Sequence, residues 1–197
     1  MGKYNEKEND DYLLKYNLLG IDSREELERA EALAFSLRAM ALEQNDFIFG
    51  SFTLKEFHDL HYYLFQDIYP FAGKFRDVQL MKGATRFCQV QFLNSYASDL
   101  FMELNEEPLW NSLNEAADRL AYFKTELNML HPFREGNGRT IRIFLYAYAM
   151  DRGIEWAYET LEREKYIQAM IQSVTDLKLL KELFLETIQY IGEYNGH

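Results

Sequence analysis

The sequence predicts an all-α domain that is interrupted by one β-hairpin. Apolar residues recur at helical spacing on both sides of residues 75–92, whereas apolar and polar residues alternate around a glycine within that stretch. A chain of 197 residues, of which 48% are hydrophobic, can bury the core of one domain. We therefore interpret residues 1–197 as a single domain.

The composition limits the classes of protein to which the chain can belong. A net charge of −11 does not favour nonspecific attraction to nucleic acid. Cys88 is the one cysteine, which excludes an intrachain disulfide and a thiolate metal cluster and favours a cytoplasmic location. The N-terminus lacks the apolar stretch of a secretory signal, and no run approaches the roughly 18 apolar residues of a membrane span. We expect direct binding neither to nucleic acid nor to a membrane.

Residues 1–22 form an N-terminal segment, of which residues 1–11 are polar and expected to fray. A helix of about five turns is predicted to follow Ser23, because Ser23 and Glu26 have the spacing of a capping box. Thr53 has the same relation to Glu56, which predicts the start of a second helix. The apolar residues of these two helices are Leu27, Ala30, Ala34, Leu37 and Ala41, and Phe57, Leu60, Tyr63 and Leu64.

His58 and His61 lie three residues apart on the second predicted helix, a spacing found among metal ligands in helical bundles. The sequence offers no third ligand of matching pattern nearby. A helix this rich in aromatic residues often carries partly buried histidines. We therefore interpret both histidines as structural.

Residues 75–80 and 86–92 alternate apolar and polar side chains around Lys82-Gly-Ala84, which predicts a β-hairpin. An isolated hairpin leaves open strand edges, and an edge of this kind can receive an extended segment of another protein by β-augmentation. The alternative is a hairpin that only covers the helices beneath it.

The remaining chain predicts further helices. One spans Asn94 to about Asn105 and ends before Pro108. A long apolar-periodic run from Asn114 leads into His131, where Pro132 prevents continuation. The next helix follows Gly138 and stops at Gly153, and two more are expected at about 160–173 and 175–191, the last ending at Gly192. The apolar side chain of Phe133 is expected to anchor the loop after His131 in the core.

The segment His131-Pro-Phe-Arg-Glu-Gly-Asn-Gly-Arg-Thr-Ile-Arg142 is the densest in reactive side chains. His131 can act as a general base, because the pKa of an unperturbed histidine is about 6.5. Glu135 supplies the oxygen ligands that Mg²⁺ takes alongside substrate phosphates. Taken alone, a histidine before proline is typical of a helix end. A structural loop, however, has no need of a base and a carboxylate together.

The second half of this segment is suited to binding phosphates. Gly136, Asn137 and Gly138 permit a tight turn with positive φ, and their backbone N–H groups can form an anion nest at the start of the next helix. Arg139 and Arg142 are three residues apart on that helix, at its positive end, where a polyphosphate would lie. A lone Gly-x-Gly is weak evidence for a nucleotide site, but the whole set predicts phosphate chemistry assisted by a histidine.

Residues 131–142 resemble the signature of the Fic family, His-Pro-Phe-x-(Asp/Glu)-Gly-Asn-Gly-Arg-x-x-Arg, at every fixed position. Residues 64–76 look like the family's segment leading into its hairpin flap. The resemblance implies the Fic fold, a helical bundle around a central helix-loop-helix with one flap. It also implies a protein adenylyltransferase that uses ATP and Mg²⁺ to modify a hydroxyl side chain of a target protein. The target would be held by the flap, here residues 75–92 with Lys82, Gly83, Arg86 and Phe87.

Fic enzymes are typically restrained by a glutamate from a (Ser/Thr)-x-x-x-Glu-(Gly/Asn) helix, which pairs with the second arginine of the signature, here Arg142. Only Thr160 has a glutamate four residues later, and Lys165 follows that glutamate. The chain thus resembles the family's toxins, which are restrained by a separate antitoxin protein, and residues 19–27 also look like those toxins. An internal brake formed by Glu186 or Glu193 is the alternative.

The resemblance leaves the transferred group and the target open. DNA gyrase and topoisomerase IV are targets of such toxins, which makes them candidate partners. Transfer of UMP, phosphate or phosphocholine is an alternative reaction, and a non-catalytic module that binds nucleotides is a further alternative. The presence of both His131 and Glu135 favours an enzyme, because binding alone needs no base.

Overall fold

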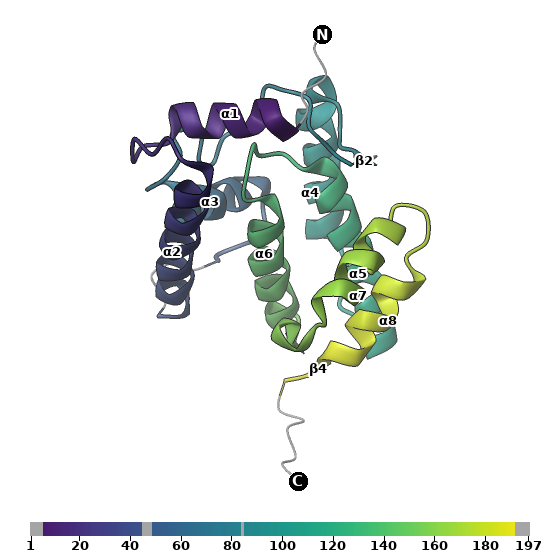
Figure 1. Ribbon diagram of the computed structural model, residues 1–197. Helices are drawn as coiled ribbons and strands as arrows, with labels where there is room; N and C mark the ends of the chain where they lie inside the picture. Colours follow the sequence, from purple (N-terminus) through teal and green to yellow (C-terminus); the bar gives the residue numbers. More distant parts are fainter. Residues whose placement is uncertain (1–5, 45–48, 84, 192–197) are drawn as a thin grey trace.

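The computed structural model describes residues 6–44, 49–83 and 85–191. Helix α6 lies between the α2–α3 pair and the group formed by α5, α7 and α8, and α1 crosses one end of α6 (Figure 1). The helices of the described residues are α1 (Glu6–Tyr16), α2 (Arg24–Glu43), α3 (Leu54–Phe65), α4 (Leu93–Glu106), α5 (Leu113–Leu130), α6 (Asn137–Asp151), α7 (Arg163–Gln172) and α8 (Lys178–Thr187), with short 3₁₀ turns η1 (Val90–Phe92) and η2 (Tyr158–Thr160).

The local signals for helix starts are confirmed. The side-chain oxygen of Ser23 accepts a hydrogen bond from the N–H of Glu26 at the start of α2, and Thr53 does the same for Glu56 at the start of α3, at 3.3 Å. The Glu56 carboxylate accepts from the N–H groups of Gly50 and Ser51, at 2.9 Å each. The predicted helices therefore begin where their caps can satisfy free N–H groups.

The prediction that residues 1–11 fray is wrong for the part that the structure describes, because α1 begins at Glu6. The Asn9 side chain donates to the backbone carbonyl of Arg134 at 3.3 Å, and the Arg134 guanidinium lies 3.6 Å from the centre of the Tyr12 ring. Helix α1 thus packs against the loop that joins α5 to α6 (Figure 1).

The hairpin exists, but its strands are shorter than predicted. Only β1 (Met81–Lys82) and β2 (Thr85–Arg86) pair, with Met81 opposite Arg86. The arms of the hairpin are bonded elsewhere: the N–H of Arg76 donates to Pro132 at 2.8 Å, and the N–H of Cys88 donates to Met129 at 2.8 Å. Because these N–H groups bond to the last turn of α5 and to the loop that follows it, they cannot extend the ladder.

A second pair of strands was not predicted. Strand β3 (Ile154–Trp156) pairs antiparallel with β4 (Ile188–Tyr190), so the last helix ends at Thr187 and does not continue to residue 191. Gly153 turns the chain from α6 into β3. Its φ of 76° lies in the left-handed region, which glycine adopts readily. The expected stop at Gly192 lies outside the described residues.

The core between the helices is built from aromatic rings. Phe57 of α3 packs against Phe101, Phe133 and Phe144, with ring centres 5.4, 5.4 and 5.1 Å away. Phe133 is completely buried, which confirms its predicted role as the anchor of the loop. Truncation of such a phenylalanine to alanine typically costs about 3–5 kcal/mol of stability.

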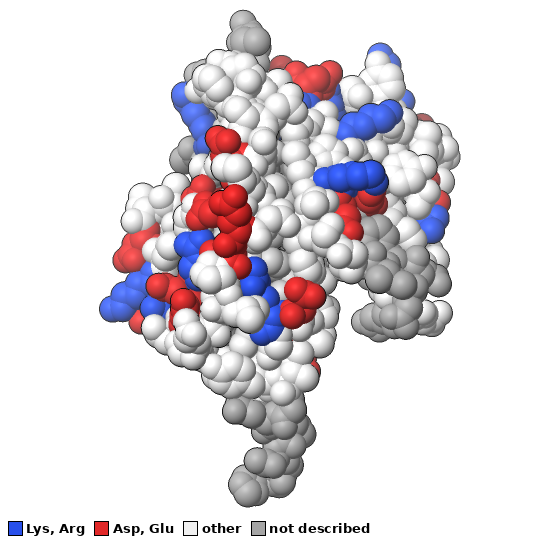
Figure 2. Space-filling model, turned by 180° about the vertical axis from the view of Figure 1, so that it is seen from behind, with Lys and Arg blue, Asp and Glu red and all other residues white. Residues whose placement is uncertain are grey.

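The surface carries both signs of charge. On the face opposite to that of Figure 1, acidic and basic side chains form small neighbouring groups with uncharged areas between them (Figure 2). Among the helices within residues 6–44, 49–83 and 85–191, none is long and apolar enough to span a membrane.

Candidate active site

His131 is held in an unusual backbone conformation at the end of α5. Its φ is 44°, and it is the one non-glycine residue with positive φ in the described chain. Such a conformation costs about 1–3 kcal/mol and persists only where the surroundings impose it. Nδ1 lies 3.2 Å from the carbonyl oxygen of Asn128, so Nδ1 carries the hydrogen and Nε2 has the lone pair. The free nitrogen is therefore the one that can accept a proton.

The flap covers the imidazole of His131. The Phe87 ring stacks on it with centres 3.6 Å apart and an interplanar angle of 6°. Burial, together with the positive charges of Arg76 and Lys82, lowers the pKa of His131 to about 3. His131 is neutral at physiological pH, and an anion bound beside it would raise its pKa toward the range of an efficient base.

Arg76 ties the flap to the end of α5. This buried guanidinium donates to the carbonyl oxygens of His131, Val78 and Cys88 at 2.7, 2.7 and 2.6 Å. Burial lowers the pKa of Arg76 to about 10, so it stays charged and compensates the negative end of α5. Its importance was not foreseen, because the three acceptors are backbone groups that sequence patterns do not reveal.

The predicted turn with positive φ is present at Gly136, where φ is 78° and α6 begins. A Cβ on Gly136 would lie 2.4 Å from the Phe65 ring, so glycine is required there. The Asn137 side chain accepts from the N–H of Phe133 at 2.9 Å and donates to the Phe133 carbonyl at 2.7 Å. Asn137 thus braces the loop, while Gly138 is exposed and has open space beside it.

His61 supports this loop from α3. Its Nδ1 accepts from the N–H of Gly73 at 2.8 Å, and its Nε2 donates to the Glu135 carbonyl at 2.9 Å. Burial lowers the pKa of His61 to about 3. His58 Nδ1 contacts the Gly73 carbonyl at 2.6 Å, and no group of three or more metal-binding side chains occurs in the part of the chain that the structure describes. Both histidines thus contact the backbone of Gly73, one at its carbonyl oxygen and the other at its N–H.

Glu135 has a half-buried side chain that keeps 39% of its surface exposed. Its Oε1 accepts from the N–H of Gly136 at 2.8 Å and lies 3.4 Å from Arg139 Nη2. Burial raises the pKa of Glu135, and the neighbouring carboxylate of Glu31 raises it further. Within residues 6–44, 49–83 and 85–191, Oε2 has no hydrogen bond, so one oxygen remains for a cation.

The two arginines of the motif have different neighbours. The Arg139 guanidinium forms an ion pair with Glu31 of α2. The Arg142 guanidinium lies 5.3 Å from the centre of the Tyr158 ring, and no described carboxylate pairs with it. The buried Nε of Arg142 also has no hydrogen-bond partner among the residues that the structure describes. Glu193 lies outside the described residues.

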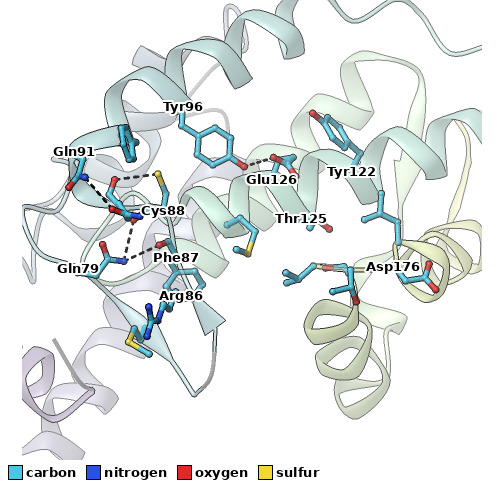
Figure 3. A pocket seen from close by; sticks show the side chains of 18 residues that line it. Gln79, Arg86, Phe87, Cys88, Gln91, Tyr96, Tyr122, Thr125, Glu126 and Asp176 are labelled. Atoms are coloured by element: carbon cyan, nitrogen blue, oxygen red, sulfur yellow. Dashed lines mark hydrogen bonds between the residues drawn. The ribbon is translucent and has the colours of Figure 1, made fainter. Parts of the chain in front are cut away.

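A groove of about 950 Å³ adjoins the flap. Its walls come from the flap, from α5 and from the segment between α7 and α8, as Figure 3 shows for Arg86 and Phe87, Thr125 and Glu126, and Asp176. Phe87 lines the groove and its ring also stacks on His131, whereas His131 and the other residues of the motif are not part of the groove walls. Lys82 and Gly83 lie exposed at the tip of the flap.

Solved structures share this fold. The BepC protein of Bartonella tribocorum, solved with bound AMPPNP, superposes with a TM-score of 0.79 at 20% identity and covers 88% of this chain and 91% of that one. The N-terminal Fic domain of a VirB-translocated effector of Bartonella quintana, solved with bound ADP, gives a TM-score of 0.80 at 22% identity over 88% of this chain and 90% of that one. The helical architecture with its short hairpin is therefore that of Fic domains.

Sequence relatives agree with this fold. A model of the Fic/DOC family matches residues 51–149. The "Probable protein adenylyltransferase Fic" of Escherichia coli is 32% identical over 90% of this chain and 88% of its own length. The "Protein adenylyltransferase VbhT" of Bartonella schoenbuchensis is 38% identical over 88% of this chain, and the match spans 37% of VbhT. The chain belongs to the Fic/DOC family.

Proposed function

We propose that this protein is an adenylyltransferase that transfers AMP from ATP to a hydroxyl side chain of a target protein. The observation that carries the proposal is His131, whose Nε2 keeps its lone pair and whose loop leads directly into a glycine turn at the start of a helix. Family membership and relatives named as protein adenylyltransferases support this reaction.

The nucleotide would lie between the groove and α6. The groove is wide enough for a nucleoside and has aromatic walls that include Tyr96 and Tyr122. The phosphates would approach the N-terminus of α6 beside Gly136, Asn137 and Gly138, where backbone N–H groups attract anions. Arg142 would then neutralise the terminal phosphate, because its guanidinium is not paired with a described carboxylate.

Glu135 fits the role of a Mg²⁺ ligand. Its Oε2 has no hydrogen bond within the described chain, and the nearby Arg139 compensates only part of the local negative charge. Mg²⁺ would supply positive charge to the phosphates as the leaving group departs. The loop fixes the carboxylate through the bond from the N–H of Gly136.

His131 would act as the general base. The target hydroxyl attacks the α-phosphorus, its proton moves to Nε2, the new oxygen–phosphorus bond forms, and the bond to pyrophosphate breaks. The helix N-terminus and Arg142 stabilise the charge that develops on the leaving group.

The target would bind at the flap. Strands β1 and β2 pair over two residues each, so an extended segment of the target can continue the ladder beside Lys82, Gly83, Arg86 and Phe87. Subunits of DNA gyrase and topoisomerase IV are the first targets to test.

A separate antitoxin would restrain the enzyme. Its glutamate would occupy Arg142 in a charge-assisted pair and so exclude the terminal phosphate. The unpaired state of Arg142 within the described residues supports this arrangement. The isolated chain should then be active without an activating substitution, and removal of Glu193 should change its activity little. A large gain on Glu193→Gly would instead establish an internal brake.

Radioactive labelling tests the reaction. Purified protein incubated with α-³²P-ATP and candidate targets should label a target, and His131→Ala should abolish labelling while an ATP analogue still binds. Labelling by the variant at the wild-type rate would remove His131 as the base. Label from γ-³²P-ATP in place of α-³²P-ATP would establish phosphate transfer.

A further inference from the structure

Helix α2 brings a carboxylate to the motif from more than 100 residues away in the chain. Glu31 Oε1 pairs with Arg139 Nη2, and Glu31 Oε2 accepts a hydrogen bond from the Tyr69 hydroxyl. Only 13% of the Glu31 side chain is exposed, against 25% of Arg139. The pair is therefore shielded from solvent, and Tyr69 fixes the orientation of the carboxylate.

The surroundings of Arg139 reinforce this geometry. Its guanidinium lies 5.2 Å from the centre of the Phe35 ring and 4.8 Å from that of Phe65. Phe65 is also the ring that leaves no room for a Cβ on Gly136. Arg139 and the glycine turn consequently contact the same side chain, that of Phe65, so the position of Arg139 is coupled to that of the turn.

The pair with Glu31 leaves part of the Arg139 guanidinium available. Both acidic partners, Glu31 and Glu135, contact Nη2. Nε and Nη1 have no hydrogen bond to any residue that the structure describes, although an arginine fork carries five N–H donors. One edge of the guanidinium is thus held by the protein, and the other can reach a phosphate.

We propose that Glu31 is a positioning residue for nucleotide binding, which holds Arg139 so that its remaining donors meet the phosphates beyond the α-phosphate. This inference rests on the proposed function, because it assigns Arg139 to the polyphosphate of ATP. A fixed guanidinium loses less conformational entropy on binding than a mobile one. Glu31 does not act as a brake in this arrangement, because it pairs with Arg139 and not with Arg142, which has no carboxylate partner within the described chain.

Nucleotide affinity tests the inference without requiring transfer. Calorimetry with Mg²⁺ would compare a non-hydrolysable ATP analogue with AMP for the wild type, Glu31→Ala and Glu31→Gln. Glu31→Ala should weaken binding of the ATP analogue about tenfold, the size of one charge-assisted hydrogen bond, and should change AMP affinity less than twofold. Glu31→Gln keeps an acceptor for Arg139 and should recover part of the loss. In the Arg139→Ala background, Glu31→Ala should have no further effect.

Glu28→Ala is the matched control, because it removes another carboxylate from the same helix. The Glu28 side chain is 65% exposed and pairs only with Arg24 in the described chain. Unchanged or tighter binding of the ATP analogue by Glu31→Ala, or an equal loss for AMP, would overturn the inference. Additive losses in the double variant would do the same. If Glu31→Ala fails to fold, the same affinities are measured for Glu31→Gln and for the double variant Glu31→Gln with Arg139→Ala, and the same criteria apply. Selective loss of ATP affinity in an enzyme that labels no target would refute the proposed function and leave this inference standing.

Discussion

Replacement of His61 by glutamine should remove a defined part of the acid sensitivity of the fold. His61 is fully buried, and burial lowers its pKa to about 3, whereas the pKa of histidine in the unfolded chain is about 6.5. At a pH between these two pKa values, His61 is therefore protonated in the unfolded state and neutral in the folded state. Stability contributed by neutral His61 is complete above pH 6.5 and is lost as the pH falls.

The magnitude follows from this difference in pKa. Between pH 7 and pH 5, His61 alone should lower the free energy of unfolding by about 2 kcal/mol, at 1.36 kcal/mol per pH unit once the unfolded histidine is protonated. A glutamine can still accept from Gly73 and donate to Glu135, but it does not titrate. Urea unfolding of both proteins at pH 7, 6 and 5, followed by circular dichroism, measures the difference. An equal decline in the wild type and His61→Gln would refute a neutral buried His61.

Three further substitutions test other parts of the account. Glu135→Gln should reduce Mg²⁺-dependent transfer at least tenfold with little change in stability, and equal activity across a Mg²⁺ titration would exclude Glu135 as the ligand. Gln89→Pro suits the local φ of −69° and removes a backbone N–H group. It should therefore impair target labelling more than Gln89→Ala, which keeps that N–H group. Equal effects of the two substitutions would argue against main-chain pairing at the flap. Arg76→Met leaves three carbonyls without their donor and should lower the free energy of unfolding by about 3 kcal/mol in urea, whereas a loss below about 1 kcal/mol would show that water replaces the guanidinium.

Local signals predicted much of the helical fold. Ser23 and Thr53 mark helix starts because a capping hydrogen bond spans only three residues. The burial of Phe133 followed from an apolar residue in a polar loop. The bounds of the flap strands could not be predicted, because the alternating pattern cannot reveal that the N–H groups of Arg76 and Cys88 bond to the loop after α5 and to its last turn.

Interactions between distant segments escaped the sequence analysis. The pairing of β3 with β4 joins short apolar runs more than 30 residues apart, and the second run continues the helical pattern of α8. The contact of Glu31 with Arg139 joins α2 to α6, and a glutamate on a helix rich in glutamate carries no signal of its own. The groove likewise arises from three segments that only the fold brings together.

Mass spectrometry of a modified target tests the central claim most directly. A purified gyrase or topoisomerase IV subunit incubated with the wild-type protein, ATP and Mg²⁺ should gain the mass of one AMP on a hydroxyl side chain, and the same target incubated with His131→Ala should gain nothing. A gain of phosphate or another group, or an equal gain of AMP with His131→Ala, would contradict AMP transfer assisted by His131.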